Sequence, residues 1–335
     1  MMAQMLDELN SLTSEVMGPL GMGSLYKCLF LKSSSACALE HSAFSGSLLV
    51  CIAIIIYSFV ASVLGKNCSK VDQLWSITPW VFGWYWFAHD LYTQAATKGT
   101  HQRLLVVCVC MTLWGVRLTY NFWRRGGYGN LVSHEEDYRW PILREMIGRW
   151  GGWPLFMFFN LTFIATYQNL LLWLIAAPAH SVMVSNDRSL NTADCLAAAA
   201  FIFLLALETL ADQQHWNYHL KKYCPGLSAS ARKNHPDPDV VDGFYQSGLW
   251  RYSRHPNYFF EQLIWVNVYA FSLTHGGPLL NAYALGPVLL VLLFQGSMAF
   301  GESITRKKYP KYANYCRRTS QCLPWFPAVL EDKAE

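Results

Sequence analysis

The feature that most constrains this chain is a series of apolar segments, each close to the length that crosses a lipid bilayer. A helix needs about 20 mainly apolar residues to span the hydrocarbon core. The clearest such segment covers residues 44–64 and is almost purely apolar. The others cover residues 74–89, 103–122, 154–178, 193–211, 258–274 and 279–300, and the second and sixth of the seven are short. The pattern predicts an all-α polytopic membrane protein with about seven transmembrane helices in one bundle.

The composition agrees with a membrane location. Only 14% of the residues are charged, whereas a soluble domain has about 25%. The 14 Trp and 18 Tyr suit a protein with two water–lipid interfaces, where amphipathic rings are enriched. A formal net charge of +4 is too small to indicate a nucleic-acid partner, so we expect membrane lipids rather than nucleic acid around this chain.

The distribution of Lys and Arg predicts the orientation. With seven spans, 20 of these residues fall on the side that includes the C-terminus and five on the other side. Because cytoplasmic loops are enriched in Lys and Arg, we expect a cytosolic C-terminus. This orientation depends on the number of helices.

The domain organisation is expected to be simple. Residues 1–43 are predicted to be a polar, weakly amphipathic lead-in, and residues 44–335 a single transmembrane domain without repeats or linkers. The ten Cys form no C-x-x-C pair and no Cys/His cluster with zinc spacing. We therefore expect no structural metal site.

The residues that suggest chemistry begin in the fifth span. Glu208 and Asp212 are four residues apart, so they share one face of a helix at its predicted cytosolic end. From spacing alone, a solvated helix end and a functional site are equally good interpretations. The polar segment that follows is too long for a simple turn, which favours a functional loop.

The segment 248–261 reads GLWRYSRHPNYFFE and carries five polar side chains of interest. Arg251 and Arg254 are suited to gripping phosphates, and His255 adds a titratable donor. Asn257 can donate and accept at once, which suits a carboxamide or a base edge. Glu261, four residues further and within a span, indicates a polar cavity because a lone carboxylate in a membrane is costly. A positive-inside cluster would explain the arginines but neither Asn257 nor Glu261.

The chain after residue 300 is basic and aromatic. It contains Glu302, Tyr309 and Tyr315 among seven Lys and Arg residues. Such a tail is more often a membrane-surface anchor. It could also fold over a nucleotide and supply cations and stacking rings.

These residues carry a resemblance. The segment 248–261, together with Glu302, Tyr309, Tyr315 and the closing Leu-Pro at 323–324, resembles the C-terminal region of the steroid 5α-reductase-like membrane oxidoreductases. A less characterised branch of that superfamily also shares patterns similar to D-x-x-W at 72–75, WG-x-RL at 114–118 and EDYR at 136–139. The resemblance covers about two thirds of the chain, and the S-R-H-P-N-Y core is specific to the superfamily rather than to a substrate.

The resemblance implies a seven-helix bundle that holds NADPH in a cytosol-facing cavity and reduces a C=C bond of a steroid- or lipid-like enone, with residues 193–327 as the cofactor-binding region. By position, the residues lining the cofactor site would be Asp212, Arg254, His255, Asn257, Tyr258, Glu302 and Tyr309. Glu208 stands where steroid reductases tend to have an asparagine. Two departures affect cofactor affinity: Phe260 replaces the usual glycine before Glu261, and the basic residue expected before the turn at Gly243 is replaced.

A reductase of this kind also needs a proton donor. Hydride addition to a conjugated C=C bond moves charge onto the carbonyl oxygen, which an acid or a fixed donor must stabilise. We expect Tyr138 or Tyr85 to be this donor, with Asp72 tuning it. Belt positions at the interface are the more common role of membrane tyrosines.

Two alternatives stay open. An isoprenylcysteine-type methyltransferase that uses S-adenosylmethionine shares a similar R-H-P-x-Y element and a later glutamate, although the pair Asn257 and Glu261 favours the reductase. A non-catalytic membrane scaffold is the other, and Phe260 is the feature in its favour. The resemblance implies the endoplasmic reticulum as the location.

Overall fold

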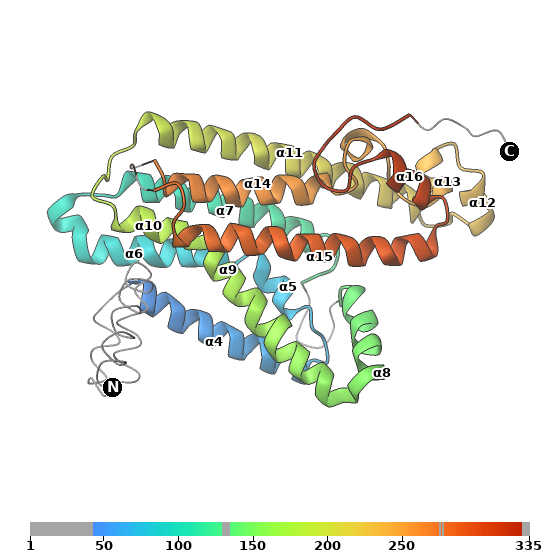
Figure 1. Cartoon of the computed structure of the whole chain (residues 1–335), viewed down its shortest axis with the longest axis horizontal. Helices are drawn as coiled ribbons and strands as arrows, with labels where there is room; N and C mark the ends of the chain where they lie inside the picture. The colour runs from blue at the N-terminus through green and yellow to red at the C-terminus, as the bar shows by residue number, and fades with distance from the viewer. Residues whose placement is uncertain (1–42, 129–134, 275, 277, 330–335) are drawn as a thin grey trace, which may run out of the picture. The chain divides into compact units, whose positions relative to one another are not determined.

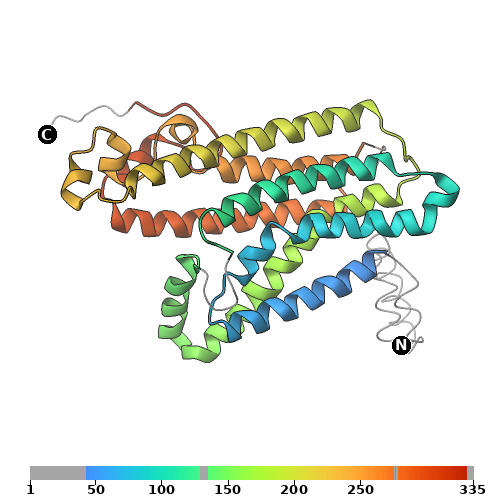
Figure 2. The ribbon, with the colours of Figure 1, turned by 180° about the vertical axis from the view of Figure 1, so that it is seen from behind.

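The computed structural model describes residues 43–128, 135–274, 276 and 278–329. The predicted polar lead-in, apart from its last residue, lies outside this part of the chain. All regular elements in the described residues are helices, as Figures 1 and 2 show from opposite sides. They are α4 (Ala43–Leu64), α5 (Lys70–Trp75), α6 (Thr78–Lys98), α7 (Gln102–Trp123), α8 (Arg139–Phe159), the π-helix η1 (Asn160–Tyr167), α9 (Gln168–Ala176), α10 (Pro178–Val184), α11 (Thr192–Lys222), α12 (Ala229–Lys233), α13 (Pro238–Asp242), the 3₁₀-helix η2 (Gly248–Arg251), α14 (Pro256–Phe271), the 3₁₀-helix η3 (Ala282–Ala284), α15 (Leu285–Lys308) and α16 (Tyr312–Arg318). The prediction of an all-α chain is confirmed for these residues.

The chain forms two compact units. The N-terminal unit contains Met1–Ala198 and Val268–Pro287, and the C-terminal unit contains Ala199–Asn267 and Val288–Glu335. Helices α11, α14 and α15 each contribute residues to both units. The single transmembrane domain expected for residues 44–335 stays a prediction.

Five helical segments in the described part of the chain are long and apolar enough to cross a membrane. They are Ala43–Leu64, Gln102–Trp123, Arg139–Val184, Thr192–Lys222 and Ala282–Lys308. Each contains or overlaps one of the predicted spans. The protein therefore has the character of a polytopic membrane protein.

The count of seven spans is not confirmed, and the two segments that fall short are the two short ones of the sequence prediction. Helix α6 covers the second, but polar residues such as His89 and Asp90 lower its hydropathy. Helix α14 covers the sixth and has 16 residues, which rise about 24 Å in an α-helix. This is less than the hydrocarbon core of about 30 Å. The predicted orientation depends on these two helices and stays a prediction.

Polar side chains inside the apolar helix α4 satisfy their hydrogen-bonding capacity locally. The hydroxyls of Ser47 and Ser62 donate to the carbonyls of Phe44 and Phe59, three residues earlier. Each also accepts a bond from another helix, from Trp173 Nε1 at 3.0 Å and from Asn160 Nδ2 at 2.9 Å. Interhelical hydrogen bonds of this kind are a common way to join membrane helices.

Helix α8 is interrupted where the fourth predicted span was expected to begin. Gly152 has φ +66° and ψ −163°, a backbone conformation open to glycine and rare for other residues. Pro154 follows two residues later, and proline is common in the first turn of a helix. Arg139, Arg144 and Arg149, which were expected in a loop, are helical and precede this break.

In the N-terminal unit, a fully buried ion pair joins the starts of α7 and α11. Arg103 at the start of α7 donates from Nε to Asp194 Oδ2 of α11 at 2.8 Å, and both side chains have 0% exposure. Its two other nitrogens donate to the carbonyls of Asp187 and Phe271 and to the hydroxyls of Ser185 and Thr274. A buried charge must be paired and hydrogen-bonded, and Arg103 meets that requirement in full.

Candidate functional site

The motif segment 248–261 lies in the C-terminal unit and is fixed by bonds to α11. Trp250 Nε1 donates to the carbonyl of Ala211 at 3.1 Å, and the Leu249 amide donates to Gln214 Oε1 at 2.9 Å. The Trp250 ring stacks on His215 with a centroid separation of 4.6 Å. These contacts place the beginning of α14 against the α11 residues that include Asp212.

Arg254 forms a buried clamp with Glu302 of α15. Its Nε donates to Oε1 at 2.8 Å and its Nη2 to Oε2 at 3.1 Å, with side-chain exposures of 8% and 4%. Its Nη1 donates to the carbonyls of Cys316 and Thr319. The guanidinium that the sequence suggested for a phosphate is thus engaged by the carboxylate and by the end of α16.

The backbone around Arg254 joins the C-terminal segment of the chain. The Arg254 amide donates to the Ser320 carbonyl at 2.9 Å, and Ser253 Oγ donates to the Cys322 carbonyl at 2.6 Å. The Trp325 amide donates to the Tyr252 carbonyl at 2.9 Å. Residues 320–325 are therefore fastened to the motif segment.

His255 shares the same carboxylate and begins a stack of rings. Its Nε2 lies 3.1 Å from Glu302 Oε1, and its side chain is 17% exposed. The ring stacks on Tyr258 with a centroid separation of 5.5 Å, and Tyr258 stacks on Phe294 of α15 at 4.6 Å. Arg254, His255 and Glu302 thus form one charged cluster with an aromatic wall beside it.

Asn257 meets Asp212 across α14 and α11. Its Nδ2 donates to Asp212 Oδ1 at 3.2 Å. Its Oδ1 is buried, and among the described residues it has no hydrogen-bond partner. Glu208, one turn before Asp212, and Glu261, one turn after Asn257, are both buried, at 2% and 8% exposure. Because Asp212 is also buried, at 7% exposure, Glu208 and Asp212 do not form a solvated helix end, which was one of the two interpretations that their spacing left open.

A second cluster in the C-terminal unit surrounds the ammonium of Lys222. Its Nζ donates to the Gly243 carbonyl and, at 2.9 Å, to the Tyr309 hydroxyl, and it lies 4.7 Å from the centroid of the Tyr309 ring. Burial favours a higher pKa for Tyr309, but the hydrogen bond and charge of Lys222 outweigh it and lower that pKa below its usual value. Gly243 has φ +86°, and a Cβ there would lie 2.3 Å from the Tyr309 ring. A glycine is therefore required under Tyr309.

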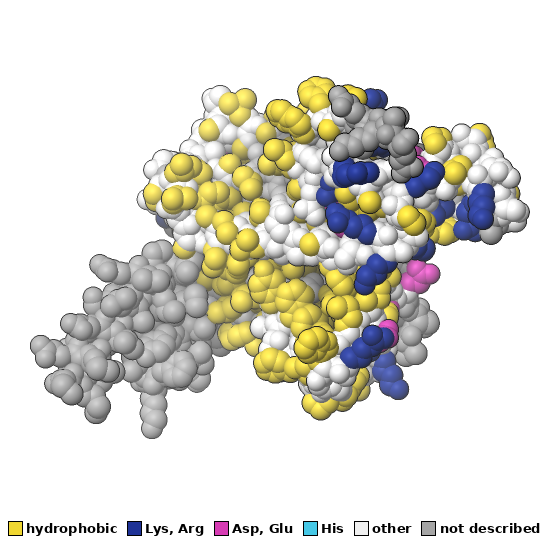
Figure 3. Space-filling view, turned by 45° about the vertical axis from the view of Figure 1, so that its right-hand side comes forward, with side chains coloured by type: hydrophobic (Ala, Val, Ile, Leu, Met, Phe, Trp, Pro, Cys, Tyr) yellow, Lys and Arg dark blue, Asp and Glu magenta, His cyan; other side chains and the backbone are white. Residues whose placement is uncertain are grey.

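The remaining predicted residues of this unit differ in exposure. Tyr315 is buried, and its hydroxyl donates to the Trp250 carbonyl. Arg251, in contrast, is exposed. Phe260, at the position of the family's usual glycine, is buried and contacts the ring of Phe259. Exposed Lys and Arg side chains gather around the α16 end of this unit (Figure 3).

The three residues expected to donate or tune a proton lie in the N-terminal unit. Asp72 Oδ2 accepts from Trp140 Nε1 at 2.9 Å. Tyr85 is half-buried on α6, with its hydroxyl against Gly46 of α4. Tyr138 is 57% exposed at the start of α8. Their catalytic roles stay predictions.

Two parts of the candidate site were not predicted from the sequence: the side chain of Lys222 and a pair of backbone carbonyls. Lys222 was counted only as a loop cation, although burial places it against Tyr309. The carbonyls of Cys316 and Thr319 carry no side-chain signal at all, and only the fold reveals that they complete the Arg254 clamp. The sequence signal that could have identified Lys222 is a lysine at the end of a long apolar helix that is followed by a glycine turn.

The comparisons with known proteins fit this geometry. The family model described as "Protein of unknown function (DUF1295)" matches residues 58–319, and the chain belongs to that steroid 5α-reductase-like family. The chain is 36% identical over 266 residues to "Uncharacterized protein C594.04c" of Schizosaccharomyces pombe, covering 78% of this chain and 74% of that protein. No solved structure matches the chain. The matched segment contains both clusters of the C-terminal unit.

Proposed function

We propose that this protein is a membrane-embedded, NADPH-dependent reductase that acts on a C=C bond of a steroid- or lipid-like substrate. The observation that carries the proposal is the buried Oδ1 of Asn257, an acceptor with no partner among the described residues. A buried polar atom without a partner costs about 1–3 kcal/mol. An amide NH₂, such as that of a nicotinamide carboxamide, would satisfy it.

The residues around Asn257 fit such a ligand. Asp212 holds the Asn257 amide nitrogen, so the oxygen is presented in a fixed orientation. The stacked rings of His255, Tyr258 and Phe294 supply an aromatic wall beside it. The exposed guanidinium of Arg251 is available for phosphates, because Arg254 is engaged by Glu302.

The roles of the charged cluster follow from its bonds. Glu302 neutralises Arg254 and fixes His255, so a half-buried imidazole is held in one orientation next to Tyr258. Lys222 and Tyr309 hold the Gly243 turn, which the motif segment follows. We assign Arg254, Glu302, Lys222 and Tyr309 to shaping the site, and Asn257, Asp212, His255 and Tyr258 to contacting the cofactor.

The chemistry of the reaction requires a cofactor and an acid. When bound, NADPH supplies the hydride. The developing charge on the substrate carbonyl needs a fixed donor, and we propose Tyr85 for this role because it is half-buried on α6, whereas Tyr138 is mostly exposed. Loss of turnover in Tyr85→Phe with normal turnover in Tyr138→Phe is the expected result. Equal turnover in both would remove the assignment.

A membrane-bound lipid reductase of this family would work in the endoplasmic reticulum with its C-terminus in the cytosol, where NADPH is available. The predicted excess of Lys and Arg on the C-terminal side supports this orientation. A tag at the C-terminus should be accessible to antibody after selective permeabilisation of the plasma membrane. A tag that requires opening of the internal membranes would reverse the orientation.

The proposal is tested by thermal stabilisation of the detergent-purified protein with NADPH, NADH and S-adenosylmethionine. A ligand at 100 times its dissociation constant stabilises the folded state by about 2.7 kcal/mol. We expect stabilisation by NADPH that disappears in Asn257→Ala. The matched control is Asn267→Ala, because Asn267 lies on the same helix and its Oδ1 also has no partner among the described residues.

Each other outcome of this experiment has a definite meaning. Stabilisation by S-adenosylmethionine alone would replace the reductase by a methyltransferase. Stabilisation by none of the three would favour a non-catalytic scaffold, in which Phe260 fills the space of the cofactor. An equal loss in both Asn variants would show that the effect belongs to the helix rather than to Asn257.

A further inference from the structure

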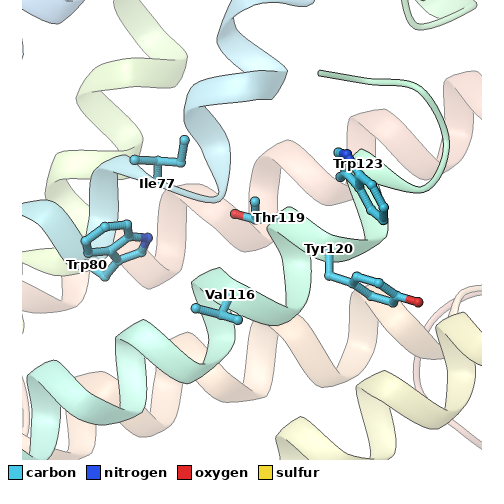
Figure 4. Close-up of a pocket in the computed structure, with 6 residues that line it drawn as sticks. All are labelled: Ile77, Trp80, Val116, Thr119, Tyr120 and Trp123. Carbon is cyan, nitrogen blue, oxygen red and sulfur yellow. The ribbon is translucent and has the colours of Figure 1, made fainter. Parts of the chain in front are cut away.

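The N-terminal unit has a pocket that the proposed reaction does not use. It has a volume of about 430 Å³ and is lined by Ile77, Trp80, Val116, Thr119, Tyr120 and Trp123 (Figure 4). Ile77 precedes α6 and Trp80 lies in its first turn, whereas the other four residues belong to the last two turns of α7. The volume lies within the range of small-molecule sites, about 300–1,000 Å³.

The wall formed by Trp80 is held in place. Its Nε1 donates to the Ser76 carbonyl at 2.9 Å, so its polar atom is satisfied away from the pocket. Its ring rests on Gly115 of α7, where a Cβ would lie 2.3 Å from it. The glycine thus allows the indole to lie flat against the helix. The Trp80 wall of the pocket is therefore fixed by the fold.

The side chains that line the pocket present almost only apolar surface to its interior. Of the two hydroxyls among the lining residues, Thr119 Oγ1 is hydrogen-bonded to Ser76 Oγ at 2.8 Å, and Ser76 is bonded in turn to Tyr128. The Tyr120 hydroxyl points away from the other lining side chains (Figure 4). The walls are the faces of Trp80, Tyr120 and Trp123. An occupant would find dispersion contacts and almost no free polar group, so it must be a hydrocarbon.

The surroundings indicate where the hydrocarbon comes from. Helix α7 is one of the five candidate membrane spans, and its residues Val109, Leu113 and Val116 are 44%, 44% and 60% exposed. In a bilayer this side of α7 faces lipid chains. The pocket lies at the C-terminal end of the span, where Trp and Tyr are typical of the lipid–water boundary.

Positive charge lies next to the pocket. The guanidinium of Arg124 is 5.5 Å from the ring centroid of Tyr120, and the next residue, Arg125, is exposed. Basic residues at the end of a membrane helix attract anionic lipid headgroups. An apolar pocket and an adjacent cationic pair match the two parts of one acidic phospholipid.

We propose that this pocket is a binding site for one anionic membrane phospholipid, with an acyl chain between Trp80, Tyr120 and Trp123 and the net negative charge of the headgroup at Arg124 and Arg125. The site belongs to the N-terminal unit and does not depend on the reductase activity proposed above. Binding there would fasten the α5–α6 turn to the end of α7.

The experiment is native mass spectrometry of the detergent-purified protein with dioleoyl phosphatidylserine or dioleoyl phosphatidylcholine. Val116→Trp fills the pocket, and Val109→Trp is its control. Val109 lies seven residues earlier on the same face of α7, is also exposed, and does not line the pocket. Because both positions face outward, both variants should fold.

The expected results separate the two halves of the site. The wild-type protein and Val109→Trp should retain one phosphatidylserine that Val116→Trp loses. Arg125→Gln should weaken phosphatidylserine binding roughly five-fold and leave phosphatidylcholine unchanged, since one basic residue is worth about 1 kcal/mol at an anionic surface. Equal retention of phosphatidylserine by Val116→Trp and Val109→Trp would contradict binding in the pocket. Equal retention of phosphatidylserine and phosphatidylcholine by the wild-type protein would contradict a role for the two arginines.

Discussion

Among the described residues, each unit has a buried arginine paired with a carboxylate, Arg103 in one and Arg254 in the other, and these two pairs differ in what surrounds them. Arg103 and Asp194 have no exposure, and the partners of Arg103 are a carboxylate, two hydroxyls and two carbonyls. Arg254 and Glu302 are also buried, but Glu302 additionally contacts the half-buried His255. The charges of the first pair contact only groups that satisfy Arg103, whereas Glu302 of the second pair also contacts the imidazole ring of His255.

The difference indicates which buried charge is structural and which shapes a site. A buried ion pair is weak evidence for added stability, since its desolvation is costly. Where every donor is satisfied by the protein, as at Arg103, the pair fixes the ends of helices. Where the next residues carry a ring stack and the unsatisfied buried acceptor of Asn257, we propose that the pair positions groups of the cofactor site.

The largest expected effect is that of Arg103→Met. Removal of one partner leaves Asp194 as an uncompensated buried charge, which costs about 3–5 kcal/mol. We expect a large fall in the unfolding temperature of the purified protein, or loss of folded protein. A change of less than about 1 kcal/mol would show that Asp194 finds another partner and that this ion pair is not required.

Arg254→Met should produce a loss of about 3 kcal/mol or more, with a local consequence that Arg103→Met does not have. The carbonyls of Cys316 and Thr319 lose their donor, so the C-terminal segment should be cleaved sooner in limited proteolysis. Glu302→Gln keeps an acceptor for Arg254 and should release the segment less. Unchanged cleavage in Arg254→Met would contradict the clamp.

Gly243→Ala should cost roughly 1–3 kcal/mol through its left-handed backbone alone, and more through contact with Tyr309. Gly226→Ala is a matched control, because Gly226 has φ +87° and nothing lies within 4 Å of its added Cβ. The difference between the two measured free energies of unfolding isolates the Tyr309 contact. Equal losses would show that the ring moves without cost.

The smallest effect is expected for Arg149→Gln. Arg149 and Glu145 form an i,i+4 pair on α8, but their side chains are 74% and 66% exposed. Such pairs contribute about 0.3–0.5 kcal/mol. The unfolding temperature should hardly change, and a change as large as that of Arg103→Met would mean that exposure does not separate structural from surface pairs.

The sequence predicted the helices better than their contacts. Long apolar segments reveal membrane helices because a bilayer imposes a minimum length. The two segments that fall short, α6 and α14, are those in which polar residues or a short length weaken this signal. The break at Gly152 was not predicted, since isolated glycines occur throughout the chain.

The candidate site was predicted in its residues and not in its geometry. The motif around Arg254 and Asn257 predicted a phosphate contact for Arg254, whereas in the structure Arg254 binds Glu302 and two carbonyls. A sequence motif cannot reveal backbone acceptors, because every residue has a carbonyl whatever its side chain. Lys222 was treated as one of many cations, because only packing distinguishes a buried lysine from an exposed one.

The most direct test of the central claim is hydride transfer itself. The purified protein would be incubated with membrane lipid extract and with NADPH that carries deuterium at the transferable position of the nicotinamide. We predict deuterium bound to carbon in a lipid product with the wild-type protein and with Asn267→Ala, and none with Asn257→Ala. Absence of deuterium in every lipid, with transfer of a labelled methyl group from S-adenosylmethionine instead, would contradict the account.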